Sequence, residues 1–364
     1  IALDGQVFEV VAWQQRWRIY IGEGRDGPLL KRDAEQRWAL DLNEPLPGGG
    51  QALGSLSDAP LPPPSASGRT MTAIGMGMIE RLQPRKARVI REAHEQAVRY
   101  TRDCLEHLQS VREVSEFSHE TQRFLARVFS VATVEKALLG KLKRAVDKIL
   151  ATLQSAEYSP INSARYGLFF SPDQRSIAMT SKMGLLIKYK AVFLGDRYFA
   201  SAEDIFERSV IGRDGLEFDR VKHYTAAILI HEFSHVALNT IDINYLGVSH
   251  PFEELLVPEP SLQGPVSKLK RQMHDHRYKQ LTTEVPRLDL FKEKATNRRT
   301  YFAMDFRLEY VLMKKTHCQT IDQVRSRFFS DPAFRADVIL MNADSLALLI
   351  TWLGYFKPPA VVTA

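Results

Sequence analysis

The stretch Thr225–Leu238 constrains the fold more than any other part of the chain. It contains neither glycine nor proline, and most of its residues are apolar. Such a stretch is expected to form a helix that is buried on almost all sides. The same stretch carries His231, Glu232 and His235, and polar side chains of this kind are rarely buried without partners. The sequence therefore predicts a core helix whose polar residues serve one common site.

These three residues form a His-Glu-x-x-His pattern. Residues four apart lie on one helix face, so the imidazoles of His231 and His235 can reach one cation, at about 2.0–2.1 Å from each nitrogen for zinc. Glu232 cannot join them from that face and is suited to act as a general base on water beside the metal. A buried helix that holds two histidines by chance is the alternative, and the apolar flanks favour the metal site.

A catalytic zinc takes a third protein ligand, and the spacing leaves two options for it. A histidine six residues after His235 is excluded because that residue is Ile241. Glu253 and Glu254 lie about where gluzincins supply a glutamate from a following helix. Asp242 lies seven residues after His235, just past the expected end of the helix. The spacing alone does not decide between these two options for the third ligand.

The residues after the helix resemble a known family. Thr240, Asp242 and Tyr245 follow the His-Glu-x-x-His pattern in the order of the aspzincin signature, which continues Gly-Thr-x-Asp-x-x-Tyr-Gly in the deuterolysin and peptidyl-Lys metalloendopeptidase group. The run from Asn342 to Ser345 (Asn-Ala-Asp-Ser) resembles a stretch in the last helix of the lysine-specific branch. The resemblance covers about residues 79–356.

The resemblance implies a set of roles. His231, His235 and Asp242 would be ligands of Zn²⁺, and Glu232 would be the base. Tyr245 would donate its hydroxyl to the oxyanion of the tetrahedral intermediate. A tyrosine in the core is the alternative for Tyr245.

Three further residues are expected behind the ligands. Asn342, Asp344 and Thr240 would brace a ligand imidazole or the metal-binding turn. For Asn342 and Asp344, helix capping or a buried hydrogen-bond network is an equal alternative. The chain departs from the family at Asn239, where a glycine is usual, although asparagine also tolerates a left-handed conformation. A lysine-specific pocket is not expected to transfer, because Leu246 replaces the glycine after the tyrosine.

Composition divides the chain into three predicted parts. Residues 1–43 alternate like strands and predict a small β-rich module. Residues 44–75 are rich in proline, glycine and serine and predict a linker. Residues 76–364 predict a zincin-like metallopeptidase domain. This last part combines two long helical patterns, which suggest a helical hairpin, with three short strand-like runs; the helical patterns are 79–115 and 119–155, and the strand-like runs are 166–170, 185–189 and 191–194.

The expected fold class is therefore α+β, mainly α, with a small sheet. The apolar share of 45% supports a sizeable core, and no run of apolar residues is long enough to span a membrane. Cys104 and Cys318 cannot form a disulfide framework and are expected to be free thiols. The net charge of +6 is too small to predict nucleic-acid binding.

The expected function is that of a zinc metalloendopeptidase acting on protein substrates. Because the chain begins at Ile1 and a linker precedes the enzyme part, we expect it to be cargo of a larger bacterial toxin or effector, secreted or delivered into a target cell. Two alternatives remain open. One is a non-catalytic binding module that zinc stabilises. The other is a hydrolase of the gluzincin type, which would use Glu253 or Glu254 as the third ligand.

Overall fold

A computed structural model describes most of the chain. The described residues are 2–3, 6–13, 16–21, 29–32, 38–41, 70–170, 177–182, 190–199, 218–256, 261, 263–293, 298–299 and 306–358. The chain divides into two compact units: residues 1–94 with 153–200, and residues 95–152 with 201–364. The predicted division at residue 76 stays a prediction, because residues 44–69 of the predicted linker lie outside the described residues.

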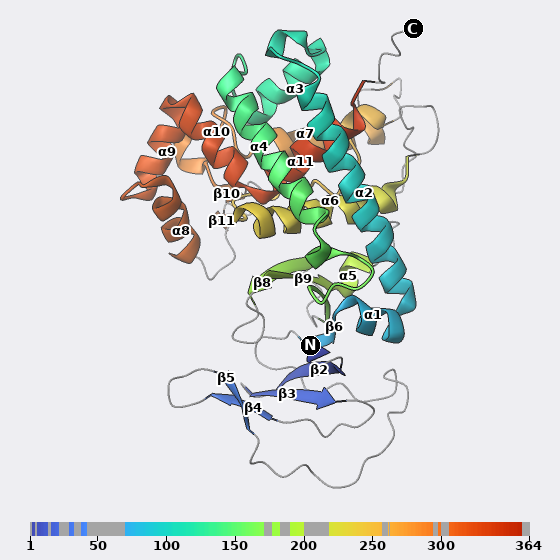
Figure 1. The fold of residues 1–364 in the computed structure, drawn as a ribbon. Helices are drawn as coiled ribbons and strands as arrows, with labels where there is room; N and C mark the ends of the chain where they lie inside the picture. The colour runs from blue at the N-terminus through green and yellow to red at the C-terminus, as the bar shows by residue number, and fades with distance from the viewer. Residues whose placement is uncertain are drawn as a thin grey trace. The chain divides into compact units, whose positions relative to one another are not determined.

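The first unit contains two sheets (Figure 1). The N-terminal sheet is antiparallel with the order β1-β2-β3-β4-β5. Its strands are β1 (Ala2–Leu3), β2 (Gln6–Trp13), β3 (Arg16–Ile21), β4 (Leu29–Arg32) and β5 (Trp38–Asp41). The strand-like alternation of this region therefore corresponds to strands.

The second sheet is mixed, with the order β6-β7-β9-β8. Its strands are β6 (Thr70–Ile74), β7 (Tyr166–Phe170), β8 (Ala178–Lys182) and β9 (Lys190–Gly195). β7 and β9 are parallel, and both were predicted as strands. Gly167 lies under the ring of Phe193, where a Cβ would come within 2.4 Å of a ring carbon. The predicted strand 185–189 lies outside the described residues.

Two boundaries differ from the sequence analysis. The last residues of the predicted linker, Thr70–Ile74, form β6, because their threonines and apolar residues pair with β7. The helical pattern over 119–155 is two helices, α3 (His119–Phe129) and α4 (Lys136–Leu153). Ser130 ends α3 in the left-handed conformation, at φ 51°, and this breaks the pattern.

The first helical pattern also begins with a break. α1 (Met76–Leu82) ends before Pro84, the first residue of α2 (Pro84–Gln109). Proline is tolerated in the first turn of a helix but not inside one, so a new helix begins there. A short helix, α5 (Asp196–Phe199), follows β9.

Two buried helices form the core of the second unit. α6 (Arg220–Leu238) is buried continuously from His223 to Ser234, and α11 (Ala343–Tyr355) from Ala343 to Gly354. They pack side by side. This confirms the predicted core helix at Thr225–Leu238. Around them lie α7 (Pro265–Tyr278), α8 (Phe306–Thr316), α9 (Ile321–Ser330), α10 (Pro332–Met341), the short helices η4 (Glu253–Leu255) and η5 (Arg287–Asp289), and the two-stranded sheet β10 (Lys292–Glu293) and β11 (Arg298–Arg299).

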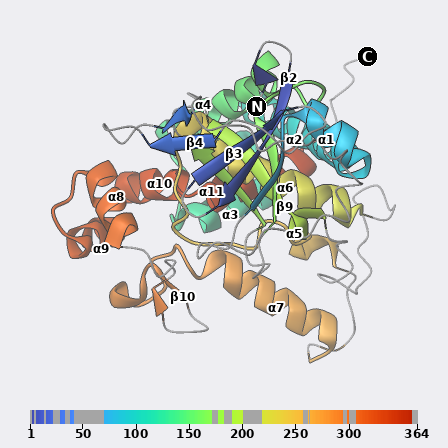
Figure 2. The same cartoon turned by 90° about the horizontal axis from the view of Figure 1, so that it is seen from below.

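Within this unit, α8, α9 and α10 gather into one group of helices, and α7 lies apart from them (Figure 2). The described chain is mainly helical with a small mixed sheet, which confirms the α+β, mainly α fold class. In the part of the chain that the structure describes, no helix has the length and apolar character needed to cross a membrane.

Candidate metal centre

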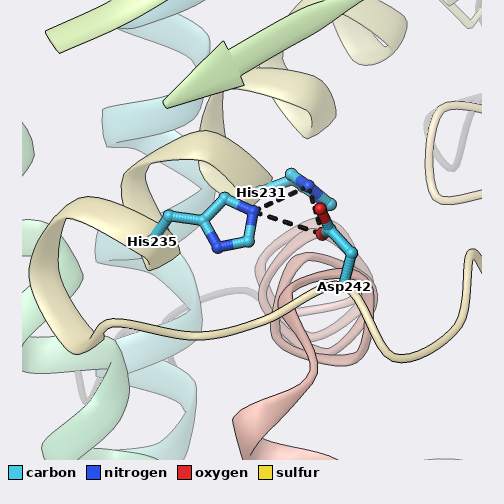
Figure 3. A group of neighbouring side chains, drawn as sticks. All are labelled: His231, His235 and Asp242. Atoms are coloured by element: carbon cyan, nitrogen blue, oxygen red, sulfur yellow. Dashed lines mark hydrogen bonds and ion pairs between the residues drawn. The ribbon is translucent and has the colours of Figure 1, made fainter. Parts of the chain in front are cut away.

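Three ligand-type atoms converge at the C-terminal end of α6 (Figure 3). Nε2 of His231 and Nε2 of His235 lie 3.1 Å apart. Oδ1 of Asp242 lies 3.1 Å from the first nitrogen and 3.2 Å from the second. These side chains form a group that could hold a metal ion. Ligand atoms arranged tetrahedrally around zinc lie about 3.3 Å apart, so the spacing fits such an ion.

The chain after α6 turns back toward the helix. Asn239 ends α6 in the left-handed conformation, at φ 55°, as its tolerance for that conformation predicts. Ile241 then pairs in parallel with Asn342: the N–H of Ile241 donates to the carbonyl of Met341, and the N–H of Ala343 donates to the carbonyl of Ile241. This short bridge to the segment between α10 and α11 fixes the backbone next to Asp242.

Asn342 holds the following turn through its side chain. Its Oδ1 accepts the backbone N–H groups of Ile243 and Asn244, at 3.0 and 3.1 Å. Its Nδ2 donates to the carbonyl of Asn244 and to the hydroxyl of Ser345. Asn342 is fully buried, and although it stands at the N-terminus of α11, its side chain caps no backbone N–H of that helix. Its side chain therefore braces the turn through a buried hydrogen-bond network and does not cap the helix.

Asp344 connects the first histidine to the chain beyond the turn. Oδ1 lies 2.6 Å from Nδ1 of His231, and Oδ2 accepts the N–H of Leu246 at 2.6 Å. An ionised carboxylate only accepts hydrogen bonds, so Nδ1 of His231 carries a proton. In the neutral imidazole, Nε2 then presents its lone pair to the other two ligand atoms.

The Nδ1 atom of His235 also faces hydrogen-bonding groups, but these are neutral. Its Nδ1 lies 3.0 Å from both the carbonyl oxygen and the hydroxyl of Thr240. Because a carbonyl only accepts, this nitrogen also carries a proton, and Nε2 of His235 is again the unprotonated one. Thr240 thus lies against a candidate ligand, where the sequence analysis expected it.

The electrostatics of the cluster require a positive charge. Burial alone would lower the pKa of His231, but the charge of Asp242, with a further contribution from Asp344, raises it well above the usual value. Burial likewise opposes ionisation of Asp242, yet the two histidines keep its pKa far below the usual value. Oδ1 of Asp242 is buried without a hydrogen-bond partner. A proton or a metal ion among the three atoms satisfies these charges.

Two other predicted residues lie beside the cluster. Glu232 is buried in α6 directly after His231. Tyr245 is 42% exposed, so it is not a core tyrosine, and its ring lies nearly parallel to that of His231 with centroids 6.1 Å apart. Desolvation, and then the charges of Asp242, Asp344 and Glu232, raise the pKa of Tyr245. Its hydroxyl therefore keeps its proton at neutral pH and can donate it in a hydrogen bond.

The alternative third ligands point to other partners. Glu253 contacts Arg127 and His274, at 3.3 and 3.4 Å. Glu254 accepts a hydrogen bond from the indole of Trp352 at 3.3 Å. Within the described residues, neither glutamate joins the group that could hold a metal ion. The structure therefore brings Asp242, and neither glutamate, to the two imidazoles.

Ser234 is a further polar residue of the site that was not predicted from the sequence. It occupies a variable position of the His-Glu-x-x-His pattern and was given no role. Its hydroxyl oxygen lies 2.6 Å from the carbonyl of His231 and 2.7 Å from the hydroxyl of Thr240. The sequence did contain a signal for this role, because a serine in the middle of a buried helix needs a hydrogen-bond partner for its hydroxyl.

Both cysteines are free thiols, as expected; Cys104 is buried and Cys318 is half-buried.

No protein-family model, curated protein or solved structure matches the chain.

Proposed function

We propose that the chain is a zinc-dependent metalloendopeptidase that hydrolyses peptide bonds in protein substrates. One observation carries the proposal. Nε2 of His231, Nε2 of His235 and Oδ1 of Asp242 meet at 3.1–3.2 Å, while the Nδ1 atom of each imidazole is occupied by an acceptor. Three acceptor atoms repel one another at this distance unless a proton or a metal ion lies among them.

Zinc is the cation that suits this donor set. Two imidazole nitrogens and one carboxylate oxygen are typical of catalytic zinc sites, in which water or substrate supplies the remaining ligand. When bound, zinc polarises the scissile carbonyl and lowers the pKa of its water to about 7. The partners of both Nδ1 atoms orient the rings and increase the basicity of Nε2.

Two side chains of this chain would carry the proton and the charge. Glu232 follows the first histidine on α6 and would take the proton of the attacking water and then pass it to the leaving amine. Tyr245 keeps its hydroxyl proton at neutral pH and would donate a hydrogen bond to the oxyanion that develops on the substrate carbonyl. Its exposure makes it accessible to a bound peptide.

The test combines zinc content with proteolysis. The purified chain is expected to bind one zinc ion and to cleave a denatured proteome, with the cleavage sites mapped by mass spectrometry. Glu232→Gln should keep zinc but lose turnover by several orders of magnitude, because the base is removed and the ligands are not. Asp242→Ala should lose zinc, whereas Glu254→Ala, the matched carboxylate control, should keep it.

Each other outcome assigns a different function. Zinc loss in Glu254→Ala but not in Asp242→Ala would make the site a gluzincin-type centre. A chain that binds zinc, cleaves nothing and unfolds with a chelator would be a zinc-stabilised binding module. Delivery as part of a secreted toxin stays a separate prediction.

A further inference from the structure

We infer that Ser234 is a positioning residue for the candidate ligand His235: acting through Thr240, its hydroxyl stabilises the tautomer in which Nδ1 of that imidazole carries the proton. The inference rests on the proposed zinc site and goes beyond it, because Ser234 touches neither the ligand atoms nor a substrate position. It assigns a function to a variable position of the His-Glu-x-x-His pattern.

The direction of the first two hydrogen bonds is fixed by chemistry. Ser234 is fully buried in α6, with its oxygen 2.6 Å from the carbonyl of His231 and 2.7 Å from the hydroxyl of Thr240. A carbonyl can only accept, so Ser234 gives its single hydroxyl hydrogen to His231. The contact between the two hydroxyls is then possible only if Thr240 donates and Ser234 accepts.

The hydroxyl of Thr240 in turn contacts the imidazole of His235. Because the hydroxyl hydrogen of Thr240 is committed to Ser234, the Thr240 oxygen can only accept from Nδ1 of His235, which lies 3.0 Å away. The carbonyl of Thr240, also at 3.0 Å, accepts from the same nitrogen. Both contacts require the proton on Nδ1. A neutral imidazole has one N–H, so Nε2 is left with its lone pair toward Asp242 and the metal position.

Removing the serine destabilises this tautomer. Without Ser234, the largely buried hydroxyl of Thr240 loses its acceptor, and an unpaired buried hydroxyl is unfavourable. The acceptor that it can reach in the described structure is Nδ1 of His235. Donation to Nδ1 requires the opposite tautomer, with the proton on Nε2, the atom that should bind the metal. This donation competes with the hydrogen bond from Nδ1 to the Thr240 carbonyl, so the metal-binding tautomer loses part of its advantage. The role of Ser234 is therefore to direct the hydrogen of Thr240 away from the ligand.

This mechanism makes an unusual prediction about a pair of substitutions. In the full chain, Ser234→Ala should weaken binding of Zn²⁺ by about 10-fold or more, the size of effect seen when the support of a metal ligand is lost. Thr240→Val removes the competing hydrogen together with the acceptor and should weaken binding less. The double variant should therefore bind zinc more tightly than Ser234→Ala alone. Thr240→Ser keeps the hydroxyl and should bind like the wild type.

Zinc affinity is measured by competition with a chelator, and the visible spectrum of the Co²⁺ form reports whether the coordination stays tetrahedral. Thr351→Val is the matched control. Its hydroxyl donates to the carbonyl of Ala347 at 2.8 Å in the buried helix α11, so the substitution removes the same kind of bond away from the site. Circular dichroism and thermal unfolding of the metal-free variants verify that each one folds.

The outcomes separate the two proposals. A wild type that binds no zinc overturns the proposed function and this inference with it. Zinc binding by the wild type with unchanged affinity in Ser234→Ala, or a double variant that binds more weakly than Ser234→Ala, overturns only the inference, because the serine would then contribute packing alone.

Discussion

His231 and His235 lie one turn apart on α6, yet they are supported from different parts of the chain. His235 is held by Thr240, only five residues away. His231 is held by Asp344, 113 residues away at the start of α11. The first support is neutral and the second is a buried carboxylate. Two histidines that are equivalent in the motif therefore depend on different parts of the fold, one on a local turn and the other on the packing of α6 against α11.

The difference between the two supports divides the site into a local half and a long-range half. The local half consists of α6, its left-handed end at Asn239 and the hydroxyl pair of Ser234 and Thr240. The long-range half consists of Asn342 and Asp344, which hold the turn after Asp242 and the ring of His231. If the two halves are separable, substitutions in one should not reproduce the effects of substitutions in the other. Four predictions test this, from the largest expected effect to the smallest.

The largest effect is expected at Asp344. Asp344→Ala removes the acceptor of His231 Nδ1 and of the Leu246 N–H, so zinc affinity should fall by about 10- to 100-fold in a chelator competition. Asp344→Asn keeps an acceptor but removes the charge and should lie between the alanine variant and the wild type. An alanine variant with wild-type affinity would show that the long-range half is unnecessary.

Asn342 tests the turn rather than a ligand. Asn342→Ala leaves the buried N–H groups of Ile243 and Asn244 without an acceptor, and the free energy of unfolding should fall by about 2 kcal/mol in urea titrations. Zinc affinity should fall as well, because Asp242 loses its fixed backbone. Asn342→Asp keeps the acceptor oxygen but loses the Nδ2 donor to the Asn244 carbonyl, so it should recover only part of the stability. If zinc affinity stayed unchanged in the alanine variant, the turn would be set by its own sequence.

The pH dependence of folding probes a third connection on α6. Burial lowers the pKa of His223 to about 3. Its Nε2 contacts the carbonyls of Val248 and His250, so it is held neutral as their donor. Between about pH 6.5 and 3 the unfolded chain binds a proton that the folded chain excludes. The stability due to this group is therefore complete above pH 6.5 and declines by up to about 1.4 kcal/mol per pH unit below it.

The measurement is urea unfolding of the metal-free protein at several pH values. His223→Gln retains a donor but does not titrate. The slope of its free energy of unfolding against pH should therefore be smaller than that of the wild type, by the amount that corresponds to about one bound proton. Parallel curves would show that His223 is protonated in the folded state, which would contradict its buried, carbonyl-bound position.

The smallest effect is expected at Asn239, in the local half. Alanine lacks the short polar side chain through which asparagine tolerates the left-handed conformation, so Asn239→Ala should lower the free energy of unfolding by about 1 kcal/mol. Asn239→Gly should change it by only a few tenths. Thermal unfolding measures both. Neither variant should affect zinc affinity as strongly as Asp344→Ala. A larger effect on zinc than that of Asp344→Ala would reverse the proposed ranking of the two halves.

Periodicity predicted the helices well because their apolar faces follow from local spacing. The break at Pro84 was predictable because proline disrupts helices for steric reasons. The break at Ser130 was not, since serine carries no strong signal for a left-handed residue. β6 was missed because its strand character depends on pairing with β7, almost 100 residues away.

The sequence by itself determined that a buried helix carries two histidines on one face, because helical periodicity and the absence of glycine and proline are local properties. It also limited the third ligand to Asp242, Glu253 or Glu254. Only the tertiary structure brings one of them, Asp242, to the two imidazoles, because this depends on the bridge between Ile241 and Asn342 and on partners that hold the glutamates elsewhere. The tertiary structure also places an acceptor beside Nδ1 of each histidine, and a neutral ring keeps its proton on the nitrogen that faces an acceptor.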